Sequence, residues 1–325
     1  MTGMARFSRI EKEGSLRRLI RRAYGTGKLD EVGRKLARDV HVRSRAAGPP
    51  FEPREFARWL GVAVVHDDIV AEGMFIEGNV QRERGGMSSA STLDHYQSKS
   101  PTIVLKSGSG LPTRSARMRE RFTIAHELGH FSIRNALADA PHDGLFSGRD
   151  PEEEMLCNSF AEELLVPRQG LSRDLCGLEL SATAMLELRD KYQVSLTCML
   201  CSISRLFRGA VAAVIWKQEG HWLTVHWSTP KSYRDLLLCD TGSTSVELAM
   251  RSSTEQIAVD QFLLNGARLK WKASSCKLPE SPHVLSVLKR GNDSLKRCVD
   301  NRPPVAAQTR TPIQASFSFS GVLAI

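Results

Sequence analysis

The 325-residue sequence lacks any stretch that approaches the ~18 consecutive apolar residues of a membrane-spanning helix. An apolar segment of the kind that a secretory signal requires does not follow Met1 either. The seven cysteines are scattered and show no disulfide framework. We therefore expect a protein of the reducing cytoplasm, with no membrane partner.

The cysteines also give little indication of a zinc ribbon or a redox site. Cys198 and Cys201 form a lone CxxC, and no second CxxC completes a zinc ribbon. Because the pair lies in the apolar run of residues 194–206, it is predicted to be packed in a helix rather than to be a redox site.

Net positive charge is scarce outside the first 50 residues. Residues 1–50 hold 13 Lys and Arg against 5 Asp and Glu, whereas the remaining 275 residues hold 32 against 31. Arg17, Arg18, Arg21 and Arg22 flank apolar residues in a short amphipathic segment that could contact nucleic acid or an acidic partner. The favoured interpretation is a solvated basic helix without a partner. The segment is also too short and too poor in apolar residues for a complete helix-turn-helix domain.

What the sequence does contain is the pentapeptide HELGH at residues 126–130, within a stretch from Ser115 to Asn135 that has helical periodicity. Two histidines four residues apart lie on one face of a helix, where both imidazoles can reach one zinc ion. The intervening Glu127 is the general base that a hydrolytic zinc site needs. His126 and His130 are thus predicted metal ligands, and Glu127 is predicted to be catalytic.

A catalytic zinc site uses three protein ligands, so a third must lie elsewhere. The acidic run at residues 152–154 is the first candidate, since it opens an apolar-periodic segment that ends at Pro167. Glu152 and Glu153 are interpreted as a solvated helix N-terminus. His142 could compete as a ligand, but it follows His130 by twelve residues rather than the six of the extended zinc-peptidase pattern.

Two motifs in order resemble the ImmA/IrrE metallo-endopeptidases, which carry a helix of the type RFTxAHELGH and then one of the type ExxANxFAxxLLxP. Residues 121–131 read RFTIAHELGHF, and residues 154–167 read EMLCNSFAEELLVP, with Cys157 in place of the usual Ala. The resemblance covers about residues 51–207. It implies a zinc (Zn²⁺) cofactor on His126, His130 and Glu154, with Glu127 as the base.

The resemblance also implies a function: cleavage of a helix-turn-helix transcriptional repressor, that is, an antirepressor peptidase. The alternatives are a regulatory binding protein or a toxin-antitoxin component that retains the zinc-peptidase fold. The intact base at Glu127 favours the enzyme, since a binding module does not need it. For the group that stabilises the oxyanion, four candidates stay open, namely His95, Tyr96, Tyr192 and Tyr233.

The expected fold class is α+β, and the resemblance implies a zincin-like core in which a small sheet packs on the two motif helices. We expect a basic extension at 1–50, the metallopeptidase domain at 51–209, a smaller β-containing region at 210–300 and a polar linker and tail at 301–325. The strand predicted at Pro101 to Lys106 could be an edge strand that binds an extended substrate, or an internal strand.

Overall fold

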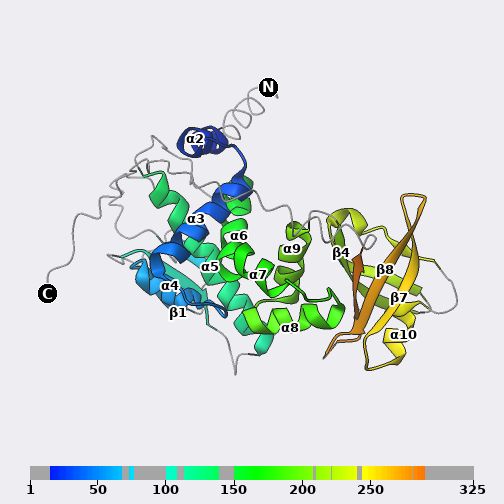
Figure 1. The fold of residues 1–325 in the computed structure, drawn as a ribbon. Coiled ribbons are helices and arrows are strands. Elements are labelled where there is room, and N and C mark those ends of the chain that lie inside the picture. Colours follow the sequence, from blue (N-terminus) through cyan, green and yellow to red (C-terminus); the bar gives the residue numbers. More distant parts are fainter. Residues whose placement is uncertain are drawn as a thin grey trace, which may run out of the picture.

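The computed structural model describes residues 15–67, 73–76, 100–107, 113–138, 150–207, 210–220, 222–239, 244–279 and 281–289. These residues form an α+β fold, as expected (Figure 1). A helical part with one small sheet occupies one side of the molecule, and a larger sheet lies beside helices α8 and α9.

Helix α6 lies at the centre of the helical part. The long helix α5 and the N-terminal helix α3 both pack against it. The helices of this part are α2 (Ser15–Tyr24), α3 (Leu29–Ser44), α4 (Pro53–Trp59), α5 (Arg114–Ala136), α6 (Pro151–Leu165), α7 (Arg168–Asp174), α8 (Ala182–Tyr192) and α9 (Leu196–Leu206).

Helix α3 was not predicted from the sequence, and it joins the basic segment to the core. Leu16 and Ile20 of α2 and Leu29 and Val32 of α3 are at most 1% exposed. They belong to the same apolar cluster as the residues of α5 and α6. The core therefore continues across residue 50, while the arginines of α2 remain on its outer face. The division into domains stays a prediction.

The small sheet has the order β1 (Ala63–Asp67), β3 (Thr102–Lys106) and β2 (Gly73–Ile76). Strand β3 runs parallel to β1 and antiparallel to β2. The predicted strand of residues 101–106 is therefore internal, and the hypothesis that it is an edge strand is wrong. Its residues Ile103, Val104 and Leu105 are buried, as expected for a strand with neighbours on both sides. Among the described strands, β2 forms the edge beside α5.

The larger sheet is antiparallel and has the order β5-β4-β9-β8-β7-β6. The hairpin at Glu219–Gly220 and the strand near residue 270 agree with the sequence, whereas β6, β7 and β9 were not predicted. Its elements are β4 (Val211–Glu219), β5 (Trp222–Thr229), the 3-10 turn η1 (Lys231–Tyr233), β6 (Leu237–Leu238), α10 (Ser245–Arg251), β7 (Gln256–Leu264), β8 (Ala267–Lys277) and β9 (Val284–Lys289).

The two faces of this sheet bury different neighbours. Ile215, Leu285 and Val287 belong to the helical core, whereas Val214, Trp216 and Phe262 belong to a second cluster that includes Val246 and Ala249 of α10. The alternation of neighbouring β4 residues between the clusters follows from the two-residue repeat of a strand. Among the described residues, no helix combines the length and the apolar character that a bilayer crossing requires.

Candidate metal centre

Helix α5 is fixed at its N-terminal half before it reaches the motif histidines. Thr113 caps the helix, its Oγ1 accepting a hydrogen bond from the backbone amide of Ala116. One turn before the motif, the buried guanidinium of Arg121 donates to Glu52, to the carbonyl of Phe51 and to the carbonyl of Gln193. These bonds tie α5 to the start of α4 and to the end of α8, so the helix is held in a set position.

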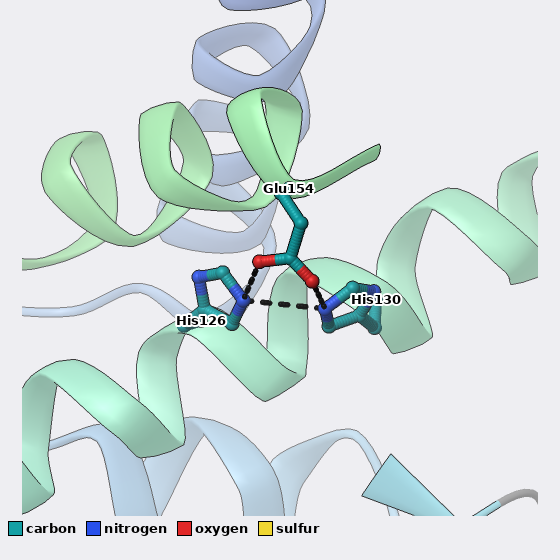
Figure 2. A group of neighbouring side chains, drawn as sticks. All are labelled: His126, His130 and Glu154. Atoms are coloured by element: carbon teal, nitrogen blue, oxygen red, sulfur yellow. Dashed lines mark hydrogen bonds and ion pairs between the residues drawn. The ribbon is translucent and has the colours of Figure 1, made fainter. Parts of the chain in front are cut away.

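Helix α6 begins earlier than the sequence pattern suggested. Asp150 is its N-cap and accepts a hydrogen bond from the backbone amide of Glu152, and Pro151 occupies the first helical position. Glu152, Glu153 and Glu154 then fill the first turn, where negative charge is favoured by the helix dipole. Of these three residues, Glu154 projects from the first turn of α6 towards the histidines of α5 (Figure 2).

Two glycines let neighbouring helices approach α6 closely. At Gly129 of α5, an added Cβ would lie 3.0 Å from Cα and 3.1 Å from Cβ of Cys157. At Gly33 of α3, an added Cβ would collide with the backbone carbonyl of Leu156. Side chains at these two positions would push the helices apart. Because glycine has no side chain, α6 packs closely between α3 and α5. The substitution of Cys157 for the usual Ala is accommodated at 0% exposure.

The close packing of α5 on α6 brings His126, His130 and Glu154 together (Figure 2). The Nε2 atoms of the two histidines are 3.2 Å apart. Nε2 of His126 lies 3.3 Å from Oε2 of Glu154, and Nε2 of His130 lies 3.7 Å from Oε1. Nitrogen and oxygen ligands at tetrahedral zinc are separated by about 3.3 Å, as the usual bond lengths dictate. The donor set thus fits a zinc ion, and three protein ligands would leave the fourth position open.

The other ring nitrogens of both histidines are also engaged. Nδ1 of His126 lies 3.1 Å from Oδ1 of Asn158, and Nδ1 of His130 lies 2.7 Å from Oε1 of Glu153. When Nδ1 donates its proton in these bonds, Nε2 keeps its lone pair for a metal, so the bonds set both the tautomer and the ring orientation. Burial lowers the pKa of His130, but the bond to Glu153 and its charge outweigh burial and raise it.

The interpretation of Glu153 as a solvated residue is wrong. It is 2% exposed, and the same Oε1 also lies 3.4 Å from Nε of Arg134. The helix dipole favours an acidic residue at each of the positions 152, 153 and 154. The sequence alone therefore does not indicate which of the three side chains faces α5. Glu152 pairs with Arg17 of α2 instead, on the side of α6 where the N-terminal helix lies.

Glu127 lies beside the donor group and is 8% exposed. Burial raises the pKa of its carboxyl, while the charge of His130 and a hydrogen bond from the backbone of Phe75 lower it again in part. Because Phe75 belongs to the edge strand β2, the carboxylate stands between the motif histidines and the small sheet. A carboxyl group with a raised pKa in this place can take up and release a proton.

The remaining candidates are not brought to this group. Tyr192 is fully buried and donates to Asp174, and Tyr233 packs against Trp271 beside the larger sheet. His142, His95 and Tyr96 lie outside the described residues. The oxyanion-stabilising group therefore stays open. Cys198 is buried in α9 and Cys201 half-buried, as expected for packed helical cysteines.

Comparison with known protein families gives a match whose range includes these residues. Residues 81–200 match the model of the IrrE N-terminal-like domain, a peptidase family. The class of the domain is thus metallopeptidase-like. Residues 81–200 thus carry a domain of the ImmA/IrrE family, and the resemblance drawn from the two motifs is confirmed.

A transcriptional regulator of Mycobacterium tuberculosis with a solved structure is 14% identical, with a TM-score of 0.42 over 85% of this chain and 79% of that chain. No curated protein matches this sequence.

Proposed function

We propose that this protein is a zinc-dependent endopeptidase whose ion is held by His126, His130 and Glu154. The observation that carries the proposal is the spacing of the three donor groups, 3.2 to 3.7 Å apart, which suits one tetrahedral ion. The hydrogen bonds from both Nδ1 atoms support it, because they leave the Nε2 lone pairs directed at the same point.

When bound, zinc supplies Lewis-acid polarisation of the scissile carbonyl and lowers the pKa of water to about 7. The chain's own contribution to proton transfer is Glu127. Its buried carboxylate takes a proton from the attacking water and delivers it to the leaving amine. A pure binding protein has no use for such a base, so the buried position of Glu127 favours the enzyme over a regulatory protein or toxin-antitoxin component that merely retains the fold.

The substrate would lie along β2. This strand forms the edge of the described small sheet, and Gly73 lies next to Thr123 and Glu127 of α5. An extended polypeptide that adds a strand to this edge would bring its backbone past Glu127. The role of the internal strand β3 is then to hold β2 in place, rather than to bind substrate.

The physiological substrate that we propose is a helix-turn-helix transcriptional repressor in the cytoplasm, which makes the protein an antirepressor. This proposal rests on the ImmA/IrrE-family domain of residues 81–200. The basic face of α2 could also contact nucleic acid, but we favour a protein partner, because Leu16 and Ile20 of that helix are committed to the core.

The metal site is tested by measuring zinc content in the purified full chain. We expect about one zinc per chain in the wild type and in Glu127→Gln, and loss of most zinc in Glu154→Ala. Glu187→Ala, which removes an exposed carboxylate of α8, is the matched control and should keep its zinc. A fully metallated Glu154→Ala protein would mean that another residue is the third ligand.

A further inference from the structure

Arg134 lies on α5 one turn after His130, so the two side chains project from the same face of the helix. It belongs to the last turn of α5, where a positive charge complements the helix dipole. The dipole accounts for a cation at this position, but it does not determine what the side chain contacts. Arg134 contacts two other elements, α6 and the small sheet. Neither contact has a part in the metal binding or proton transfer proposed above.

The contact with α6 is to Glu153. Nε of Arg134 lies 3.4 Å from Oε1 of Glu153, and Nδ1 of His130 lies 2.7 Å from the same oxygen. The side chain of Glu153 is 2% exposed, and a carboxylate so deeply buried needs a partner of opposite charge. Within the described part of the chain, Arg134 is the permanently charged partner of Glu153. A guanidinium on this carboxylate restricts its rotation, and so fixes the acceptor that the His130 ring faces.

The contact with the small sheet is to Phe75 of the edge strand β2. The guanidinium carbon of Arg134 lies 5.7 Å from the centroid of the Phe75 ring, which is within the range of a cation–π interaction. The ring of Phe131, on the same helix, packs edge-to-face against Phe75 at a centroid distance of 5.9 Å. Two side chains of α5 thus hold this ring against the helix.

Phe75 is also joined to the proposed base. Its backbone forms a hydrogen bond with the carboxylate of Glu127. The position of β2 on α5 therefore affects the surroundings of Glu127 as well as the edge along which we expect the substrate to bind. Arg134 contacts both this strand and the carboxylate that orients His130.

We propose that Arg134 is a positioning residue of the peptidase site. Through Glu153 it fixes the orientation of the His130 ring, and through Phe75 it holds β2 against α5. One side chain thereby sets a metal ligand and the substrate-binding edge relative to each other. This inference rests on the proposed function, because it assigns a role within the same site.

A double-mutant cycle on the purified full chain tests the contact with Glu153, with zinc affinity measured by chelator competition. Arg134→Ala should lower zinc affinity by about tenfold, as is typical when a group that supports a ligand is lost. In a Glu153→Ala background, the same replacement should change the affinity by less than about twofold, because Arg134 then has no carboxylate to orient. Arg117→Ala removes an exposed arginine of the same helix, and this matched control should bind zinc as the wild type does.

Arg134→Lys is the conservative variant. It keeps a positive charge within reach of Glu153, and it should therefore bind zinc more tightly than Arg134→Ala does. The side chain of Arg134 is 24% exposed, so neither replacement leaves a cavity in the core and both variants should fold. Equal losses of affinity in the two variants would contradict a role for the charge.

Hydrogen exchange tests the contact with Phe75, and it needs no metal. In metal-free protein, Arg134→Ala should speed exchange of the backbone amides of residues 74–76, relative to those of β1, by about two- to fivefold. This is the equivalent of one lost cation–π contact. Phe75→Leu should speed the same amides but leave zinc affinity near its wild-type value, because Glu153 keeps its contact with Arg134. Arg117→Ala should change neither quantity.

Failure of this inference differs from failure of the proposed function. A wild-type protein that binds no zinc would overturn the proposed function, and this inference with it. When the wild type binds zinc, the inference alone is overturned by any of three results. These are an equal effect of Arg134→Ala in both backgrounds, the same zinc affinity in Arg134→Ala and Arg117→Ala, or unchanged exchange from β2 in Arg134→Ala.

Discussion

At the scale of single residues, the chemistry depends on how two imidazoles are oriented. Glu153 and Asn158 come from α6, as does Glu154, and each engages the Nδ1 atom of a histidine on α5. One helix thus supplies both the third donor and the groups that orient the other two. A carboxylate that is 2% exposed is kept in such a place only when its bonds offset the cost of its burial.

Replacing Glu153 should weaken the metal site without removing a ligand. In Glu153→Ala, the Nδ1 proton of His130 loses its acceptor and the ring is free to rotate or change tautomer. We expect zinc affinity to fall by about 10- to 100-fold, as is typical when such supporting groups are lost. Competition with a chelator of known affinity measures this. Glu152→Ala is the control, and equal losses in the two variants would show that Glu153 acts only through the charge of the helix terminus.

The cysteines of α9 give a prediction about reactivity. Burial raises the pKa of Cys198 to about 12, so less than about one thiol in a thousand is ionised at pH 8. Cys176 is exposed. A thiol reagent at pH 8 should therefore label Cys176 in the native protein and Cys198 only after unfolding, as peptide mass spectrometry would show. Early labelling of Cys198 in the native protein would contradict its place in the core.

At the scale of elements, α6 organises the helical part. It packs against α3 on one side and α5 on the other, and glycine at both contacts sets how close the backbones come. The separation of α5 and α6 in turn sets the distance from Glu154 to the histidines. Packing and metal geometry are thus determined by the same contact.

Gly129→Ala tests this connection. The new methyl group would lie 3.0 to 3.1 Å from Cα and Cβ of Cys157, so α5 and α6 must move apart. We expect the free energy of unfolding to fall by about 1–3 kcal/mol, and zinc affinity to fall as well. Chemical denaturation and chelator competition measure the two effects.

The control for this variant is Gly48→Ala, where an added Cβ has open space around it. It should leave both quantities near their wild-type values. If Gly129→Ala were as stable as Gly48→Ala and bound zinc equally tightly, the close contact between the helices would not set the geometry of the donor group.

The sequence predicted the elements that carry strong local signals. The helices around HELGH and the segment ending at Pro167 were found by their periodicity, and the hairpin at Glu219–Gly220 by its turn residues. Helix α3 was missed because its many charges hide an apolar stripe that is recognisable only once α6 lies against it. The edge position of β2 could not be predicted either, since strand order depends on contacts between distant segments.

At the scale of the whole molecule, the larger sheet is joined to the helical part through a shared apolar cluster. Ile215 and Val287 pack on the helical side, while Trp216 and Phe262 pack on the side of α10. Loss of order in the helices should therefore expose one face of the sheet. Ligands that bind the folded helical part are expected to stabilise the sheet as well.

Zinc should consequently raise the unfolding temperature of the protein. A metal at one hundred times its Kd stabilises the state that binds it by about 2.7 kcal/mol. Calorimetric scans of metal-depleted protein with and without added zinc should show a higher Tm for the wild type and little change for Glu154→Ala. Equal increases in both would mean that zinc acts outside the group formed by His126, His130 and Glu154.

Peptidase activity with Glu127 as the base can be tested in cells. New protein N-termini would be surveyed by mass spectrometry in host cells that express the wild type or Glu127→Gln at matched levels. We expect termini that occur only with the wild type and that concentrate in one helix-turn-helix regulator. The same new termini in cells that express either protein would contradict this expectation.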